Sequence, residues 1–288
     1  MTAAHDIPDA GMEVVVCASP GDVRDWLAVS LRQLFHNCAW ARRVHVITPQ
    51  VAHATDLVEE LPDRWRRRTA VLADAVVCPE AVTLPPWYRQ QFIKLHADRV
   101  AAGERIALLG ADTLILDPID IPDLVAGDGD PRLRFFRYTY PAGHLAFERS
   151  RVLNVAALLD VQPKRSFLPG DFICDLFVLR RSVLAGLRTH LGGSAGLLAH
   201  LHSLGDRQGA DARFGEWTLY AVYVLDALGT GAPLERAEDT WFTQVHSADD
   251  LQRPAWHKAR IVHFAQAPGG PAAALRTLAG LSRLARTS

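Results

Sequence analysis

Residues 13–22 read EVVVCASPGD, and this stretch begins the pattern that decides the fold. Its first part, EVVVCA, is a continuous apolar run rich in valine, which is typical of a buried parallel strand. The next four letters, SPGD, predict a turn in which Asp22 is the N-cap of a helix. Apolar residues then recur at helical spacing until a second strand, VHVIT, at residues 44–48. The sequence therefore predicts a β-α-β unit with parallel strands.

The same alternation continues along the chain and predicts one α/β domain with a less regular second half. Further helices are expected at residues 56–68, 87–102, 150–159, 181–190 and 216–228. Further strands are expected at residues 105–109, 114–116, 133–138, 172–179 and 259–265, with a loop at 191–194. The expected organisation is a tail (1–12), a domain (13–270) with a regular first half (13–125) and a less regular second half (126–270), and a C-terminal helix (271–288).

Composition excludes several classes of protein. The chain has 288 residues, of which 49% are hydrophobic and 22% charged, with a formal net charge of −1. A disordered chain would be less apolar, and a free-standing nucleic-acid binder would be more basic. No apolar run approaches the roughly 18 residues that span a bilayer, and no signal peptide is visible. A cytoplasmic globular protein that does not bind nucleic acid is therefore expected.

The four cysteines and the standard catalytic motifs do not identify a chemistry. Cys17, Cys38, Cys78 and Cys174 form no C-x-x-C pair, so a zinc knuckle or a thioredoxin-type site is not expected. Cys17 and Cys174 lie in apolar runs and are predicted to be buried core thiols, with a cysteine nucleophile as the minor alternative. The sequence contains no G-x-G-x-x-G, P-loop, H-E-x-x-H or G-x-S-x-G motif.

Asp112 and His263 are candidate ligands of a metal ion. Asp112 follows the predicted strand at residues 105–109, and open α/β sheets place their chemistry at the carboxyl ends of strands. A carboxylate there suits a divalent metal or a ribose, or it caps the next turn. His263 lies near the end of a strand, where it suits either a metal ligand or a hydrogen-bonded core histidine. Both alternatives stay open for each residue.

The predicted helix at residues 87–102 carries a polar set consisting of Arg89, Gln90, Gln91 and Lys94. Fixed guanidinium and ammonium groups suit a diphosphate, but an ordinary solvated helix face explains the same pattern. Lys94 is notable because the only other lysines are Lys164 and Lys258.

Asp171, Asp175 and Glu216 are candidate general bases or acceptors of a substrate hydroxyl. Asp175 lies inside an apolar strand and needs a partner if it is buried. Glu216 begins a predicted helix, where the helix dipole favours a carboxylate whether or not the residue is catalytic.

Three stretches, taken in order, resemble nucleotide-sugar glycosyltransferases of the A-type fold. They are VVVCASPGD (14–22), WYRQQFIKL (87–95) and LLGADTLIL (108–116). The chain is similar to a bacterial family of glycosyltransferase-like domains that carries a W-Y-R-Q-Q-x-x-K-L helix and then a strand ending in D-A-D-T. It also resembles the glycogenin-like retaining transferases, whose terminal V-H-F strand matches IVHF at residues 261–264. The resemblance implies a Rossmann-like mixed sheet flanked by helices.

The resemblance also implies roles for individual residues. The implied binding site for a nucleotide diphosphate sugar consists of Ala18, Ser19, Asp22, Arg89, Gln91, Lys94 and Asp112. Asp112 and His263 are the implied ligands of Mn or Mg. Asp171, Asp175 and Glu216 fall where such enzymes have acceptor-binding and catalytic carboxylates.

The chain departs from the family pattern at one position, because Gly110 stands where the first carboxylate of the D-x-D motif is expected. Three interpretations stay open. Asp112, His263 and the diphosphate together bind the metal; or Arg89 and Lys94 neutralise the leaving group without a metal; or transfer activity has been lost.

The predicted function is transfer of a sugar from a nucleotide diphosphate sugar to a small-molecule or glycan acceptor, in specialised-metabolite or cell-surface glycan biosynthesis. The alternative is a non-catalytic protein of the same fold that binds a sugar nucleotide or a partner. The C-terminal helix, expected at residues 272–286, is basic and amphipathic. It is predicted to pack on the domain, with peripheral contact to an anionic membrane as the alternative.

Overall fold

The computed structural model of the chain describes residues 11–127, 129–137, 142–162, 170–172, 174–205, 213–229, 234–236, 241–244 and 259–264. The predicted C-terminal helix lies outside these residues. Within them, no helix has the length and apolar character that crossing a bilayer requires.

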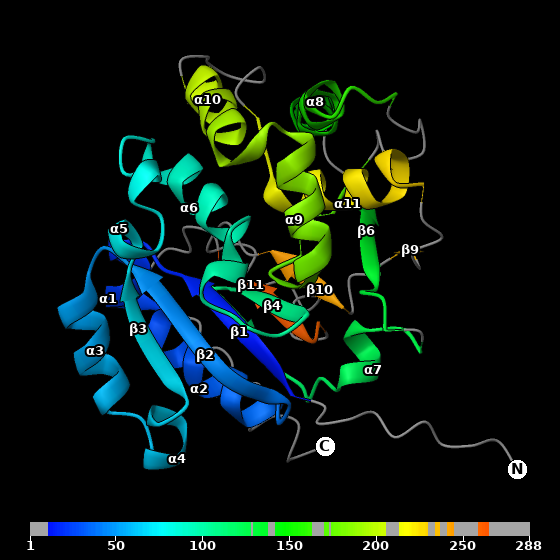
Figure 1. Cartoon of the computed structure of the whole chain (residues 1–288). Helices are drawn as coiled ribbons and strands as arrows, with labels where there is room; N and C mark the ends of the chain where they lie inside the picture. The colour runs from blue at the N-terminus through cyan, green and yellow to red at the C-terminus, as the bar shows by residue number, and fades with distance from the viewer. Residues whose placement is uncertain are drawn as a thin grey trace, which may run out of the picture.

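The first part of the chain alternates strands and helices as predicted (Figure 1). Its strands are β1 (Met12–Cys17), β2 (Ala41–Thr48), β3 (Thr69–Ala73), β4 (Arg105–Gly110) and β5 (Thr113–Ile115). Its helices are α1 (Pro20–Asp25), α2 (Leu27–Asn37), α3 (Val51–Glu59), α4 (Asp63–Arg66), α5 (Asp74–Val77), α6 (Pro86–Lys94) and α7 (Ile121–Leu124).

The second part supplies the remaining strands and helices. Its strands are β6 (Leu133–Arg137), β7 (Gly170–Asp171), β8 (Leu176–Arg180), β9 (Leu234–Arg236), β10 (Phe242–Gln244) and β11 (Ile261–His263). Its helices are α8 (Ala142–Leu158), α9 (Arg181–His190), α10 (Gly193–Gly205) and α11 (Glu216–Val222), which continues as a π-helical turn at Tyr223–Ala227.

A five-stranded mixed sheet in the order β3-β2-β1-β4-β8 forms the centre of the molecule. β1 pairs in parallel with β2 and β4, β2 pairs in parallel with β3, and β8 alone runs antiparallel. Two three-stranded sheets, β10-β11-β5 and β7-β6-β9, accompany it. The α/β fold class and the mixed sheet expected from the sequence are therefore confirmed.

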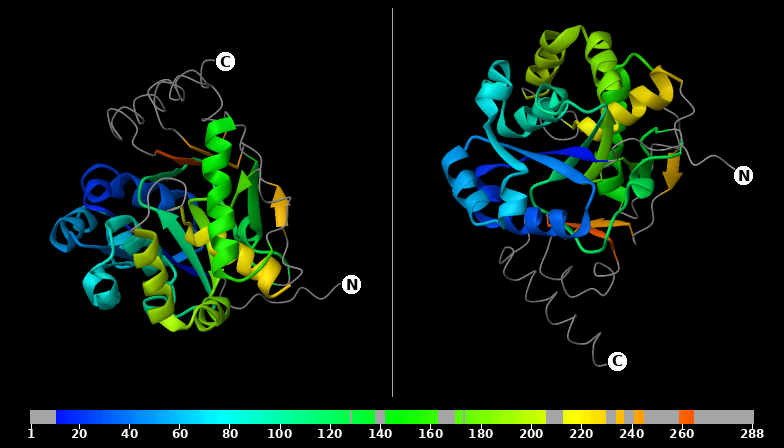
Figure 2. Two further views of the ribbon diagram at one scale, coloured as in Figure 1. Left: turned by 90° about the horizontal axis from the view of Figure 1, so that it is seen from above. Right: turned by 60° about the horizontal axis from the view of Figure 1, so that its bottom comes forward.

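The alternation of side chains along β1 divides the core into two layers. Val14 and Val16 pack with α1–α3 on one face, whereas Val15 and Cys17 pack with α6 and α9–α11 on the other. The three views show these helices on opposite faces of the sheet (Figures 1 and 2). Because both faces are covered, β1 is apolar at almost every position, as a buried strand in an α/β sheet requires.

Several predicted boundaries are wrong for local reasons. Ser19, not Asp22, is the N-cap of α1, and the two side chains form a reciprocal capping box. The helix predicted at 56–68 is two helices, because Pro62 cannot continue the first of them. β3, which follows α4, was not predicted. The helix predicted at 87–102 ends at Lys94, and just beyond this end the His96 ring bonds to the Phe92 carbonyl.

The second half contains further differences. The strand predicted at 172–179 begins only at Leu176, as β8, and Asp175 lies in a bend just before it, while the short strand β7 ends at Asp171, before the predicted start. The loop predicted at 191–194 is wrong at its last two residues, because α10, whose sequence is mostly small and apolar, already begins at Gly193. The strand predicted at 259–265 is described only at Ile261–His263 as β11, and Ala265 lies outside the described residues.

Candidate functional site

Asp112 lies in the turn between β4 and β5, just beyond the carboxyl end of β4, an inner strand of the five-stranded sheet. β11 is antiparallel to β5 and pairs His263 with Thr113. The Phe264 amide donates to the Asp112 carbonyl at 3.1 Å, and the Phe264 ring stacks on Trp26 of the α1–α2 junction at 4.9 Å. These contacts bring a histidine from near the end of the described chain beside the carboxylate that follows β4.

The His263 ring lies between two carboxylates. Its Nε2 is 3.2 Å from Asp112 Oδ2, and its Nδ1 makes a short contact with Asp175 Oδ2. Burial opposes a charge on this ring, but Asp175 and Asp112 outweigh burial and raise the pKa of His263 well above its usual value. Burial likewise opposes the charge of Asp112, yet His263 lowers the pKa of this carboxyl below its usual value.

Because Gly110 has no side chain, the Asp175 carboxylate can pack directly against it. A Cβ atom at residue 110 would lie 2.6 Å from Thr113 Oγ1 and 3.2 Å from both Cγ and Oδ1 of Asp175. The Gly110 amide also donates to the Asp175 carbonyl at 2.9 Å. Asp175 is 2% exposed, so its side chain is enclosed between residue 110 and His263. Residue 110 is a glycine beside a carboxylate that comes from the start of β8.

Lys94 and Glu216 form a second buried charged group. Lys94 Nζ lies 2.7 Å from Glu216 Oε1 and 4.1 Å from the centre of the Trp217 ring, and the two charged side chains are 6% and 2% exposed. The expectation of a solvated face on this helix is therefore wrong for Lys94. Burial disfavours the ammonium, but Glu216 outweighs burial and raises the pKa of Lys94 above its usual value.

The other polar residues of α6 also have partners inside the protein. Arg89 Nη1 lies 3.2 Å from Asp74 Oδ2, and Gln90 Nε2 donates to the Cys17 carbonyl at 3.1 Å. Gln91 is fully buried and accepts a bond from the Glu216 amide at 3.2 Å, while its Nε2 has no hydrogen-bond partner in the part of the chain that the structure describes. Gln91 is thus next to the buried ion pair.

Ala18, Ser19 and Asp22 lie after β1. The Ser19 amide donates to Asp22 Oδ2 at 2.8 Å, and the Asp22 amide is 3.2 Å from Ser19 Oγ. Burial, together with the negative charge of Asp112, raises the pKa of Asp22 above its usual value. The loop therefore lies within electrostatic reach of the Asp112–His263 pair, as the carboxyl edge of a parallel sheet requires.

Asp171 lies apart from these contacts, and the cysteines are not suited to act as nucleophiles. The backbone of Asp171 belongs to β7 and pairs with Phe136 of β6, in a different sheet from the strands that flank Asp112. The four cysteines are buried, and burial raises the pKa of Cys17 to about 12 and that of Cys174 to about 11. A thiolate nucleophile is therefore disfavoured, and the prediction of core thiols is confirmed.

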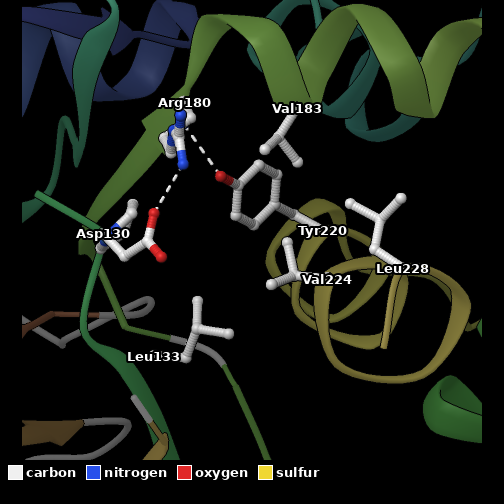
Figure 3. A pocket seen from close by; sticks show the side chains of 8 residues that line it. Asp130, Leu133, Arg180, Val183, Tyr220, Val224 and Leu228 are labelled. Atoms are coloured by element: carbon white, nitrogen blue, oxygen red, sulfur yellow. Dashed lines mark hydrogen bonds and ion pairs between the residues drawn. The ribbon is translucent and has the colours of Figure 1, made fainter. Parts of the chain in front are cut away.

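A crevice on another part of the molecule is separate from this group of residues. It is lined by Asp130, Pro131, Leu133, Arg180, Val183, Tyr220, Val224 and Leu228 (Figure 3). Arg180 pairs with Arg105 at the start of β4, so the crevice lies at the amino end of that strand and Asp112 beyond its carboxyl end. A volume of about 40 Å³ is also far below what a drug-sized ligand occupies.

The sequence missed two partnerships that define the site. It did not connect Lys94 with Glu216, which lie 122 positions apart, or Asp175 with His263, which lie 88 apart. The available signals were the scarcity of lysine and the presence of Asp175 in an apolar run, which required a buried partner without identifying it.

The donor atoms near Asp112 fit a divalent cation only in part. Carboxylate and imidazole donors suit Mn²⁺ or Mg²⁺. Among the residues that the structure describes, no three His, Cys, Asp or Glu side chains are grouped as a metal centre. Asp112 and His263 could therefore supply two ligands but not a full coordination shell. Mg²⁺ commonly binds through one or two carboxylates and completes its shell with substrate phosphates and water.

Comparison with known proteins identifies the family and the fold. Residues 22–268 match a family described as "Family of unknown function (DUF6492)", and the chain belongs to this family. None of the curated proteins matches the chain. Among solved structures, the chain is similar to the galactosyltransferase LgtC in complex with donor and acceptor sugar analogs, with a TM-score of 0.52 and 11% identity over 93% of this chain and 94% of that one.

Two further structures agree. The structure of an active-site mutant of LgtC gives a TM-score of 0.55 at 13% identity, over 93% of this chain and 94% of that one. The WbbM bifunctional glycosyltransferase gives 0.52 at 10% identity, over 92% of this chain and 47% of that one. These likenesses show that the chain has the A-type glycosyltransferase fold.

Proposed function

We propose that the protein transfers a sugar from a nucleotide diphosphate sugar to a hydroxyl or amine of a small-molecule or glycan acceptor. The observation that carries this proposal is the 3.2 Å contact between Asp112 Oδ2 and His263 Nε2, just beyond the carboxyl end of β4. Open α/β sheets bind ligands at this edge. The solved structures of the same fold are described as glycosyltransferases, which supports the same reaction class here.

In this proposal the two halves of the domain have different tasks. Residues 13–125 bind the donor, with Ala18, Ser19 and Asp22 nearest the nucleoside and Asp112 nearest the diphosphate. Residues 126–270 bind the acceptor and include Asp171. The negative charge of Asp112 contributes to the raised pKa of Asp22 in the β1 loop, which supports a single donor site along this edge.

The charges of the site favour a cation at Asp112 and His263. Lys94 is already balanced by Glu216, and Arg89 is already paired with Asp74. Asp112, Asp175 and a charged His263 together leave one negative charge in excess. Asp112 and His263 would hold a divalent cation there once Nε2 of His263 has released its proton, because only an unprotonated ring nitrogen binds a metal. The cation would supply positive charge opposite the departing diphosphate. Of the three interpretations left open by Gly110, we therefore favour the first.

Glu216 has a supporting role in this scheme. Its carboxylate is 2% exposed and in contact with Lys94, so it is not available to take a proton from an acceptor hydroxyl. We assign it to holding Lys94, whose positive charge acts at Asp112 through the buried interior.

An assay with a panel of nucleotide sugars tests the proposal. Hydrolysis and transfer are measured for the wild type and for Asp112→Asn, each with Mn²⁺ and with EDTA. We expect turnover of at least one donor with Mn²⁺, and a loss of about 100-fold or more in Asp112→Asn, because preorganised charge opposite a leaving group has effects of this size.

Asp98→Ala is the matched control. Asp98 is also a mostly buried, ion-paired carboxylate, but its partner is Arg188 and not a residue of the site. Its variant should retain turnover. Tight binding of nucleotides without hydrolysis or transfer of any donor would overturn the proposal in favour of a binding protein.

A further inference from the structure

Residue 110, where the family resemblance implies a carboxylate, lies directly beside the carboxylate of Asp175. A side chain at residue 110 would enter the space now held by the Asp175 carboxylate, since its Cβ would lie 3.2 Å from Asp175 Cγ. Residue 110 is on β4 and Asp175 comes just before β8, which is the antiparallel neighbour of β4. A side chain at residue 110 would therefore crowd the Asp175 carboxylate, which comes from the bend just before the neighbouring strand.

The Asp175 carboxylate contacts His263 at the ring nitrogen that faces away from Asp112. Its Oδ2 contacts Nδ1, whereas Asp112 Oδ2 lies 3.2 Å from Nε2. A carboxylate on one ring nitrogen fixes the orientation and the tautomer of an imidazole, and so determines which nitrogen is presented to a cation. Asp175 is enclosed, with 2% exposure, and is therefore a fixed support for the ring.

We propose that Asp175 is a positioning residue that takes over, from the neighbouring strand, the place of the carboxylate missing at residue 110 and holds His263 so that Nε2 faces the same side as Asp112. This inference rests on the proposed function, because the cation would bind at Asp112 and His263. It removes Asp175 from the candidates for a base acting on the acceptor. It also explains why the missing carboxylate at residue 110 does not imply a lost site.

Thr113 supports the same arrangement. Its hydroxyl is fully buried, has no hydrogen-bond partner among the described residues and is the atom nearest to the Cβ position of residue 110, at 2.6 Å. Asp at residue 110 in the otherwise unchanged protein would therefore collide with Thr113 and meet the charge of Asp175. A gain of function from Gly110→Asp alone is not expected.

Binding of Mn²⁺ alone, measured from the electron paramagnetic resonance of the free ion, tests the inference without any sugar donor. Asp175→Ala should weaken Mn²⁺ binding by about 10- to 100-fold, as is usual when a carboxylate supporting a metal-bound histidine is removed. Asp175→Asn should lose less, because its amide oxygen still accepts a bond from Nδ1. Asp98→Ala should bind Mn²⁺ as the wild type does.

A second experiment moves the carboxylate from Asp175 to residue 110 on β4 and measures Mn²⁺ binding in the same way. The variant Gly110→Asp/Thr113→Ala/Asp175→Ala places one carboxylate in the same space without the collision, and it should recover most of the lost affinity. Its reference is Thr113→Ala/Asp175→Ala. If the triple variant does not recover Mn²⁺ affinity relative to this reference, the inference that Asp175 takes the place of the carboxylate missing at residue 110 is overturned.

The outcomes separate this inference from the proposed function. Unchanged Mn²⁺ affinity in Asp175→Ala, with affinity lost in His263→Ala, would overturn the inference and leave the cation site intact. Equal binding by the wild type, His263→Ala and Asp112→Asn would overturn both the inference and the cation site, while the assay of nucleotide sugars with EDTA would still decide whether the protein is a transferase.

Discussion

The molecule contains two groups of charged residues near the site, and they are built differently. Lys94 and Glu216 form a balanced pair that is 6% and 2% exposed and is covered by Trp217. Asp112, Asp175 and His263 place two carboxylates on one ring, and Asp112 and His263 remain 25% and 19% exposed. The sealed group has no charge left to offer to a ligand, whereas the open group has an excess negative charge at the surface.

This difference indicates separate tasks. A buried ion pair costs a large desolvation free energy and contributes little net stability, but breaking it is costly because one charge then stays buried without a partner. Altering a partly exposed charged group costs less free energy of unfolding, because water still solvates the charge that remains. A bound cation can also compensate the excess negative charge of such a group. We therefore expect changes at Lys94–Glu216 to affect stability and changes at Asp112–His263 to affect binding.

The largest expected effect is on the sealed pair. Glu216→Gln and Lys94→Met should each lower the free energy of unfolding by about 3–5 kcal/mol, because each leaves one buried charge unpaired. The double variant Lys94→Met/Glu216→Leu should lose less than either single variant, since neither charge remains. Urea unfolding measures all three.

Glu59→Gln is the control for this prediction. Glu59 pairs with Arg66 on the surface, where its side chain is 59% exposed. Its variant should stay within about 0.5 kcal/mol of the wild type. Single-variant losses that simply add in the double variant would show that Lys94 and Glu216 are not coupled.

A smaller effect is expected in the pH dependence of stability. The pKa of His263 is raised in the folded protein because Asp175 and Asp112 outweigh burial. The folded state therefore binds the proton more tightly than the unfolded state. The resulting stabilisation is complete below the ordinary histidine pKa of about 6.5 and is lost as pH rises through the higher folded value, by at most about 1.4 kcal/mol per pH unit.

Urea unfolding in EDTA between pH 6 and 9 measures this slope. His263→Gln should remove the part of the slope that belongs to His263. The sealed pair should contribute nothing in this range, because the pKa of Lys94 is raised above its already high ordinary value. Equal slopes in the wild type and in His263→Gln would contradict the assigned charge of the ring.

The smallest effect is expected for the aromatic stack between Phe264 and Trp26, which supports the group of Asp112, Asp175 and His263 through β11. Phe264→Leu removes the ring that stacks on Trp26 at 4.9 Å and should cost about 1 kcal/mol of stability, in line with stacked aromatic pairs. Because Phe264 follows His263, Mn²⁺ binding should also weaken by a few-fold. Phe35→Leu, which breaks the stack with Trp65, is the control and should leave Mn²⁺ binding unchanged. An unaltered affinity in Phe264→Leu would show that β11 is held without this stack.

Much of the fold follows from local patterns in the sequence. The valine-rich run of β1 and the run of β4 predict buried parallel strands, and the β-α-β unit between residues 13 and 48 is confirmed. Boundaries were less certain, because they depend on single events such as Pro62 separating α3 from α4 or the His96 ring bonding to a carbonyl. The antiparallel direction of β8 has no local signature at all.

The site divides in the same way. The sequence by itself determined that Asp112 follows a central strand, that Gly110 has no carboxylate and that His263 lies in an apolar strand, because these are properties of neighbouring residues. Only the tertiary structure decided that Asp175 fills the space at residue 110, that both nitrogens of His263 face carboxylates and that Lys94 is balanced by Glu216. Burial and charge balance depend on residues far apart in the chain, and packing alone brings those residues together.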